Sequence, residues 1–212
     1  HFVTYVKGDY ELVKHWYGAK GEYHECFMYP SNLYKEYNLN SKKANVINIQ
    51  IGNSADPTNN HLEIFKKLLV YNQENIHIFA PLSYGNHNYA KEVIKIGKSY
   101  FGDKFTPITE FIPFDKYLDF LSNIDIAIFA HNRQQGFGNI ITLLGLGKKV
   151  YLRSNVTLWH LFKEFGIKVF DISTVDLERL DEATSKENQR KIKYHFSVEN
   201  LKKQLEGIFC YE

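Results

Sequence analysis

The feature that most limits the fold of this sequence is a regular alternation, from residue 45 onward, of short apolar runs with longer amphipathic segments. The short runs are rich in β-branched and aromatic residues, which favour strands, and the segments between them repeat apolar residues at helical spacing. Unbroken alternation of this kind is typical of a parallel sheet whose strands are connected by helices. We therefore predict an α/β fold with a Rossmann-like, doubly wound parallel sheet.

The pattern assigns approximate bounds to each element. The predicted strands are 46–51, 76–80, 105–109, 124–129, 149–152 and 169–171, and the predicted helices are 60–71, 87–100, 114–122, 139–146 and 158–165. Residues 1–40 read as a separate strand–helix–strand unit that ends in the polar stretch "SNLYKEYNLNSKKAN", which we interpret as an interdomain linker. Residues 185–212 have helical spacing and are predicted to form one or two terminal helices that pack across the sheet or toward a missing partner domain.

Composition narrows the class of protein. With 44% hydrophobic and 24% charged residues the chain is globular, and its net charge of +2 argues against nucleic acid as a partner. Two distant cysteines indicate a reducing compartment, and no apolar run approaches the length of about 18 residues that spans a bilayer. We expect a protein that is soluble or peripheral to a membrane. Because the chain starts inside an apolar run, without Met, we also expect it to be a piece of a longer protein.

Ligands of open α/β sheets bind at the carboxyl ends of the strands, so the loops that follow strands are the places to search. The loop "GNSADPTNN" follows the first strand of the sheet and supplies four candidate ligand contacts, Gly52, Asn53, Ser54 and Asp56. Asn60 with Glu63 three residues later predicts a helix N-cap with its reciprocal Glu. The alternative is a loop rich in turn formers and without a ligand. In the next loop, "PLSYGNHN", Ser83 and Tyr84 either face a ligand or belong to an ordinary turn.

The most specific loop is "RQQGFGN", between the fourth strand and its helix. Arg133, Gln134 and Gln135 are long and polar, and Gly136 and Gly138 permit a close backbone approach just before the helix. A helix N-terminus carries unpaired N–H groups and a partial positive charge, which suits a phosphate or diphosphate. The alternative is a glycine-rich turn with a solvated Arg. We favour the anion site, because the turn, the Arg and the expected sheet edge coincide.

Other chemistries find little support. The nine His residues show no zinc-ligand spacing, no Asp-x-Asp pair closes a strand, and neither a GxSxG nor a Walker A sequence occurs, so we predict neither a metal site nor a cofactor. His131 either donates to a leaving phosphate or is structural, and Asp56 either serves a hydroxyl or an amine or caps its loop. The catalytic residue is left unassigned.

Several stretches resemble a known family. "QGFGNIITLLGLGKKVYL" is similar to the diphosphate-binding segment of GT-B glycosyltransferases, and "VTYVKGDYELVKHWYGAKGEYHECFMYPSNL" looks like the last strand–helix–strand of their N-terminal domain. More closely, "GDYELVKHWYG", "MYPSN", "IGNSAD" and "RQQGFG" together resemble the bacterial dTDP-N-acetylfucosamine:lipid-linked-oligosaccharide transferases, also called 4-alpha-L-fucosyltransferases. The resemblance covers nearly the whole chain.

Two positions depart from the broader GT-B pattern. The Glu that binds ribose hydroxyls in related retaining enzymes is replaced by Thr142 or Leu143, depending on the alignment, which is compatible with a deoxyribose that has no 2′-OH. Lys149 stands where the motif usually has Pro.

The resemblance implies a metal-independent hexosyltransferase of surface-glycan synthesis, such as that of enterobacterial common antigen, on the cytoplasmic face of the bacterial inner membrane. Residues 1–40 would be the end of the N-terminal acceptor domain with the linker, 45–180 the nucleotide-sugar donor-binding domain and 185–212 the C-terminal helices. The donor would be a dTDP-sugar and the acceptor a lipid-diphosphate-linked saccharide. Arg133, Gln135 and the N–H groups of Gly138 and Asn139 would stabilise the departing diphosphate in place of a metal ion.

Most of the acceptor half is missing from such a piece, which we expect to be inactive alone. The main alternative is a non-catalytic Rossmann-like module that binds a phosphorylated ligand or a protein partner. A sugar-nucleotide epimerase or dehydrogenase is disfavoured, because "GNSADP" stands where a GxGxxG would follow the first strand.

Overall fold

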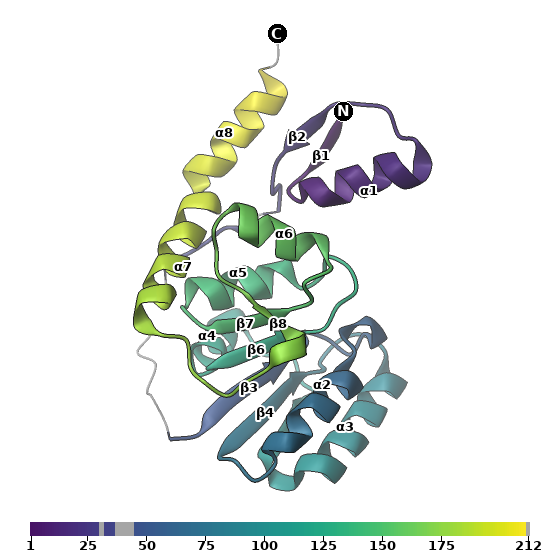
Figure 1. Ribbon diagram of the computed structural model, residues 1–212, viewed down its shortest axis with the longest axis vertical. Helices are drawn as coiled ribbons and strands as arrows, with labels where there is room; N and C mark the ends of the chain where they lie inside the picture. Colours follow the sequence, from purple (N-terminus) through teal and green to yellow (C-terminus); the bar gives the residue numbers. More distant parts are fainter. Residues whose placement is uncertain (30–31, 37–44, 211–212) are drawn as a thin grey trace.

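The computed structural model describes residues 1–29, 32–36 and 45–210 and is built around a parallel sheet (Figure 1). The strands lie in the order β5-β4-β3-β6-β7-β8, and all the pairs are parallel. Their bounds are Ile47–Ile51 (β3), Ile76–Pro81 (β4), Phe105–Ile108 (β5), Ile126–Phe129 (β6), Lys149–Leu152 (β7) and Phe170–Asp171 (β8). This is the strand order of a Rossmann-type sheet. Strands that follow one another in the chain are added toward one edge from β3 and toward the other edge from β6, so the strand order reverses between β3 and β6. The predicted fold class is confirmed.

Helices cover both faces of the sheet, which is why every residue of β6 and β7 is buried and β6 is apolar throughout (Figure 1). Helices α2 (His61–Leu68) and α3 (His87–Phe101) bury their apolar faces in one core cluster. Helices α4 (Phe114–Ser122), α5 (Phe137–Gly145) and α6 (Thr157–Glu164) contribute to the other. The alternation of strands and helices therefore arises from burial against the two faces.

The observed ends of the elements differ from the prediction by a few residues, each time for a local reason. Helix α2 ends at Leu68, and the chain continues as a 3₁₀ turn over Leu69–Tyr71. Strand β6 begins two residues late, because Ile124 still donates its N–H to Leu121 at the end of α4. Helix α5 begins two residues early, at Phe137, because the preceding glycine already forms its N-cap.

The N-terminal unit consists of β1 (Phe2–Thr4), α1 (Lys7–Tyr17) and β2 (Tyr23–Glu25), with the two strands parallel. It packs on the main body at the carboxyl end of β1, where Tyr5 stacks on Phe137 with 4.4 Å between ring centroids. The Asp9 carboxylate accepts a 2.6 Å hydrogen bond from the Thr157 hydroxyl of α6. The proposed linker falls largely outside the described residues, which leave out 37–44.

Two helices, α7 (Glu182–His195) and α8 (Val198–Phe209), end the chain. Helix α7 packs on α5, and its buried Asn188 exchanges two 2.8 Å hydrogen bonds with the backbone of Lys168. Helix α8 returns to the N-terminal unit beside β2, where the Gln204 side chain accepts from Phe27 N–H and donates to Glu25 (Figure 1). The tail thus bridges the main sheet and the N-terminal unit.

Lys149 stands where the GT-B motif usually has Pro. Its buried side chain connects β7 to the segment after β8. Its side chain is 5% exposed, and Nζ donates to Asp176 Oδ1 at 2.5 Å and to the Glu178 carbonyl at 3.0 Å. Nζ also lies 4.8 Å from the centre of the Phe170 ring. A charge taken out of water in this way is tolerated only with such partners.

We expect Lys149→Ala to lower the free energy of unfolding by roughly 2 kcal/mol, because it leaves the Asp176 carboxylate without its cation. The loss is smaller than for a fully buried pair, since Asp176 is 46% exposed. Urea denaturation measures it. Lys163→Ala, at an exposed position of α6, is the control. Equal losses in the two variants would contradict the role given to Lys149.

Candidate functional site

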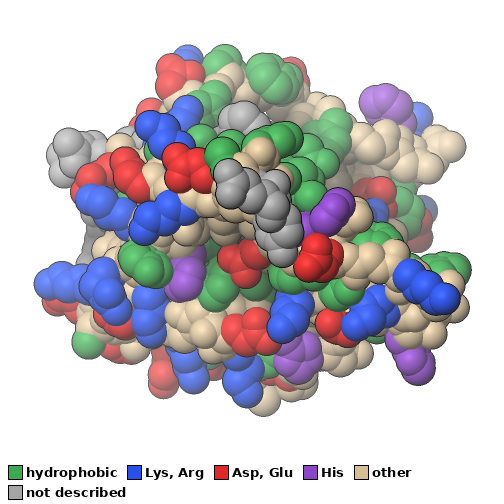
Figure 2. Space-filling model, turned by 90° about the horizontal axis from the view of Figure 1, so that it is seen from above, with side chains coloured by type: hydrophobic (Ala, Val, Ile, Leu, Met, Phe, Trp, Pro, Cys, Tyr) green, Lys and Arg blue, Asp and Glu red, His purple; other side chains and the backbone are tan. Residues whose placement is uncertain are grey.

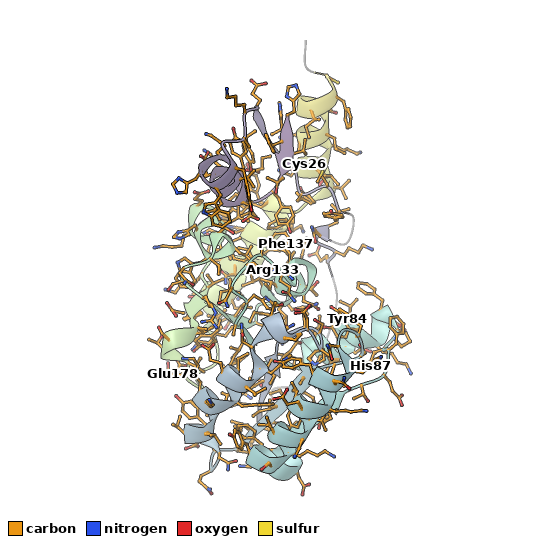
Figure 3. The ribbon with its side chains drawn as sticks, turned by 90° about the vertical axis from the view of Figure 1, so that its right-hand side faces the viewer. Cys26, Tyr84, His87, Arg133, Phe137 and Glu178 are labelled. Atoms are coloured by element: carbon orange, nitrogen blue, oxygen red, sulfur yellow. The ribbon has the colours of Figure 1, made fainter. Side chains whose placement is uncertain are left out.

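The candidate site lies where the strand order reverses, between the carboxyl ends of β3 and β6. Gly52 N–H donates to Ile128 at 2.9 Å, which joins the end of β3 to β6. The loop after β6 carries Arg133 and leads into α5 at Phe137, and both residues lie between the N-terminal unit and the main sheet (Figure 3). Tyr84, on the loop after β4, lies farther from the N-terminal unit than Arg133 and Phe137 do (Figure 3). The structure therefore brings the three loops singled out in the sequence to one edge.

Gly136 shapes the start of α5. Its φ of +67° is left-handed, and a Cβ there would lie 2.9 Å from Asn53 Oδ1 and 3.4 Å from His131 Cε1. Conformation and space both require glycine. No side chain among the described residues caps the helix, so the N–H groups of its first turn have no capping side chain. This is the arrangement that binds anions.

A buried polar network holds the turn from below. Asn59 Oδ1 accepts the Asn53 N–H at 2.9 Å and lies 2.9 Å from His131 Nε2, while Asn59 Nδ2 donates to Ser54 Oγ at 3.1 Å. Asn59 and the neighbouring His61 are fully buried. Ser54 is thus engaged in the network, and His131 is a structural residue with its ring directed at Asn59. Neither Asn59 nor His61 was expected from the sequence, because nothing in "PTNNH" distinguishes a buried Asn from a turn residue.

Asn60 is the N-cap residue of α2, as predicted, but the predicted side-chain cap with its reciprocal Glu63 is wrong. Asn60 has a left-handed φ of +53°, whereas an N-cap that bonds its own helix is extended, and its side chain donates instead to Ala130 at 2.7 Å. Glu63, the expected reciprocal partner, forms an ion pair with Arg153. Both side chains therefore connect α2 to the loops after β6 and β7 rather than closing their own helix.

Asp56 and Gln135 both contact the hydroxyl of Thr58. Thr58 donates from its hydroxyl and its N–H to the Asp56 carboxylate, and these bonds hold the pKa of Asp56 below its ordinary value. Gln135 Oε1 lies 2.7 Å from the same Thr58 hydroxyl. Asp56 therefore caps the turn Pro57–Asn59, which is the structural alternative considered for it.

A cavity of about 150 Å³ opens beside the start of α5. Asn53 donates to the Tyr84 hydroxyl at 2.9 Å on one side, and Tyr117 of α4 donates to Asn139 of α5 at 2.7 Å on the other. The remaining wall includes Ser83, Glu110, Phe111 and Ile112. Tyr84 and Asn139 were expected at the site. Tyr117 and Glu110 were not, because they follow β5, whose loop has no unusual sequence.

A groove of about 510 Å³ runs along the other side, between α1 and the loops after β6 and β7. Arg133 is exposed and lines this groove, and Gln134 lines it as well. The facing side of α1 presents Leu12, Val13 and Trp16, and Trp16 is 64% exposed. The predicted residues are therefore divided between a cavity and a groove with the α5 turn between them. That Gly52, Gly138 and the others contact a ligand stays a prediction.

We expect the two buried histidines to make the fold acid-sensitive. Burial, followed by the nearby Arg133 charge, lowers the pKa of His131 to about 4, and burial lowers the pKa of His61 to about 3. The unfolded chain protonates them near the ordinary value of 6.5 and thus binds more protons below it, so the free energy of unfolding falls as the pH drops from about 7 to 4.

Urea denaturation at pH 7, 6, 5 and 4 measures this dependence. His131→Gln should reduce the slope by up to about 1.4 kcal/mol per pH unit, the amount that belongs to one proton. The same change at the exposed His15 is the control for loss of an imidazole. A slope that His131→Gln leaves unchanged would disprove the assignment.

Comparison with known proteins agrees with this architecture. The GtfA/B complex superposes with a TM-score of 0.65 at 7% identity, over 98% of this chain and 44% of that one. AviGT4, a glycosyltransferase involved in avilamycin A biosynthesis, gives 0.60 at 11%, over 96% and 61%. A glycosyltransferase from Rickettsia africae gives 0.61 at 16%, over 77% and 47%. These likenesses are of fold, that of GT-B glycosyltransferase domains, and this chain spans between 44% and 61% of their lengths.

A family model supplies the relationship that distant folds cannot. The model described as 4-alpha-L-fucosyltransferase, glycosyl transferase group 56, matches residues 3–202. The match includes nearly all of the N-terminal unit, the whole parallel sheet and the three loops of the candidate site. The protein therefore belongs to the 4-alpha-L-fucosyltransferase family of glycosyl transferase group 56.

Proposed function

We propose that this chain is the donor-binding part of a glycosyltransferase that moves N-acetylfucosamine, or a related deoxy-amino sugar, from a dTDP-sugar to a lipid-diphosphate-linked oligosaccharide. The observation that carries the proposal is the start of α5: a left-handed Gly136 opens the helix, Asn139 of its first turn lines the cavity, and Arg133 and Gln134 of the loop before it line the groove. Family membership supports the reaction class.

The diphosphate of the donor would lie against the first turn of α5. Ile140 is the first residue of α5 whose N–H bonds back to the Gly136 carbonyl. The N–H groups of the three residues before it, Phe137, Gly138 and Asn139, belong to the first turn of the helix. Together with the helix dipole they favour negative charge. Arg133 stands on the loop leading into this turn and would add a charge-assisted hydrogen bond as the leaving group forms. A metal ion is then not needed for this step.

The base would occupy the cavity next to the turn. Tyr84 and Phe111 offer aromatic faces there, and Glu110 and Asn139 offer acceptors. A deoxyribose fits the residues of α5: the Thr142 hydroxyl donates back to the Gly138 carbonyl at 2.8 Å, and Leu143 is fully buried. Neither side chain replaces a carboxylate that would bind a 2′-OH, which favours dTDP over a ribonucleotide.

The acceptor would approach along the groove that α1 lines. Trp16 provides a face on which a sugar ring packs, and Arg133 and Asn155 provide polar contacts close to the start of α5. The N-terminal unit also exposes Tyr17, Met28 and Tyr29, and hydrophobic side chains lie among charged ones on the end of the molecule that carries this unit and α8 (Figure 2). Such a surface favours peripheral contact with the cytoplasmic face of a bacterial inner membrane, where a lipid-linked acceptor resides.

In this proposal the protein attaches to the membrane surface and does not span the bilayer with a described helix. Among the described residues no helix combines the length and apolar character needed to cross a bilayer. Because the chain spans only part of the compared glycosyltransferases, the rest of the acceptor site and the base that deprotonates the acceptor hydroxyl are assigned to regions outside it.

We expect Arg133→Ala to weaken dTDP binding about tenfold or more, the loss of one charge-assisted hydrogen bond, while thymidine binding stays unchanged. Titration calorimetry with dTDP, UDP, GDP, ADP and thymidine measures both effects. Arg190→Ala is the matched control, since Arg190 is exposed on α7 and pairs with Glu187. Equal weakening of dTDP and thymidine would remove the diphosphate role of Arg133.

A change in the cavity should behave differently. Tyr84→Ala removes an aromatic face that would contact the base, so we expect it to weaken dTDP and thymidine by the same factor, about five- to tenfold. Tyr194→Ala, at an exposed Tyr of α7, controls for the loss of a surface ring. Nucleotide binding without preference among the bases, unaffected by Tyr84→Ala, would instead favour the non-catalytic module.

A further inference from the structure

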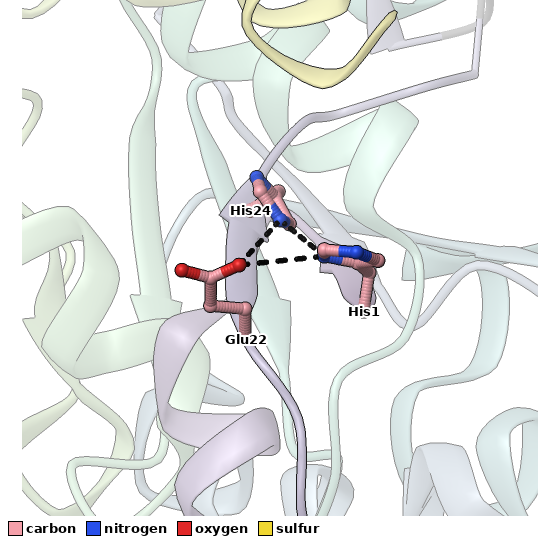
Figure 4. Close-up of side chains that lie close together, drawn as sticks. All are labelled: His1, Glu22 and His24. Atoms are coloured by element: carbon pink, nitrogen blue, oxygen red, sulfur yellow. Dashed lines mark hydrogen bonds and ion pairs between the residues drawn. The ribbon is translucent and has the colours of Figure 1, made fainter. Parts of the chain in front are cut away.

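Three side chains with metal-ligand chemistry meet at the amino end of the β1–β2 pair, away from the candidate donor site (Figure 4). His1 Nδ1 lies 2.9 Å from His24 Nε2 and 3.6 Å from Glu22 Oε2, and His24 Nε2 lies 4.0 Å from the same carboxylate oxygen. Across residues 1–29, 32–36 and 45–210, no other group of three His, Cys, Asp or Glu residues is close enough to hold a metal ion.

The parallel strand pairing produces this cluster. Phe2 is in register with Tyr23, and Phe2 N–H donates to the backbone carbonyl of Glu22 at 2.7 Å. The residues directly before the two strands, His1 and Glu22, therefore lie side by side. Glu22 and His24 are two residues apart in an extended segment and therefore point to the same face. His1 lies 21 positions before Glu22 and 23 positions before His24 in the sequence. A search for ligands at local spacing therefore does not find this group.

We propose that His1, Glu22 and His24 form a binding site for a divalent transition-metal ion, with Zn²⁺ as the best-fitting ion. Two imidazoles and one carboxylate are an established ligand set for zinc, with bonds of about 2.0–2.2 Å and a fourth position for water. In a tetrahedron with such bonds the ligand atoms are about 3.4 Å apart, and the three observed separations, from 2.9 to 4.0 Å, lie on both sides of this value.

The cluster is also partly arranged before an ion binds. The His24 side chain is only 13% exposed, and the two rings are in contact, with 4.9 Å between their centroids. The Glu22 carboxylate supplies negative charge to balance part of the charge of the ion. Binding therefore orders mainly the exposed His1 and Glu22, which keeps the entropic cost low.

The ion would have a structural role. It would join His1, which directly precedes β1, to Glu22 and His24 at the start of β2, whereas Tyr5 and Asp9, which follow β1, make the contacts with α5 and α6. A two-stranded sheet is weakly stable by itself, so a link between its strands would steady the unit that lines the groove. This role is independent of the donor site and of whether glycosyl transfer needs a metal.

Titration calorimetry with ZnCl₂ in chelator-treated buffer, together with Co²⁺ absorption spectra, tests the site. We expect one ion per chain. His24→Ala should reduce Zn²⁺ affinity by more than about tenfold, and Glu22→Gln should reduce it by a smaller factor. At about 100 times Kd, Zn²⁺ should raise Tm by about 5 °C in the unaltered chain and not in His24→Ala.

Controls separate this site from other ligands. His15→Ala removes an exposed imidazole of α1, and Cys210→Ser removes the exposed thiol near the C-terminus, and both should leave the affinity unchanged. A chain with an extra residue before His1 separates the imidazole from an α-amino group as ligand and should bind equally well. Absence of Zn²⁺ binding, or binding that His24→Ala leaves intact, would overturn the proposal.

Discussion

The side chain of Asn59 holds the two halves of the candidate site together. It accepts the N–H of Asn53 from the loop after β3 and faces the ring of His131 from the loop after β6, the two strands between which the sheet reverses. Gly136 turns directly above this contact, with Asn53 too close for any side chain at that position. Because helix α5 begins from this turn, the direction of its N–H groups depends on the buried amide of Asn59.

The position of α5 connects the fold to the proposed reaction. Its first turn lies between a small cavity, walled by the loops after β4 and β5, and a larger groove, walled by α1. A donor whose base fills the cavity would place its diphosphate on the turn and its sugar toward the groove, where an acceptor has access. The stacking of Tyr5 on Phe137 places the N-terminal unit against the same turn, so the geometry of both compartments is set at one residue of α5.

The success of the sequence analysis follows the physics of burial. Strand β6 is apolar along its whole length, and β7 is apolar after its first residue, because both faces are covered, and that pattern is visible without a structure. The glycine turn before α5 was recognisable because a left-handed residue and a helix start leave a local trace. Asn60 shows the opposite case: its sequence context fits a cap, but a longer-range hydrogen bond to Ala130 uses the side chain.

The sequence by itself determined the α/β class, the succession of strands and helices, the glycine turn that opens α5 and the family. The tertiary structure decided that Tyr117 and Glu110 join the loop of Asn53, that Arg133 lines a groove along α1, and that His1 meets Glu22 and His24. The physical reason is the range of the interactions. Burial and backbone conformation act on neighbouring residues and leave periodic patterns, whereas strand pairing and loop contacts join residues whose separation along the chain carries no pattern.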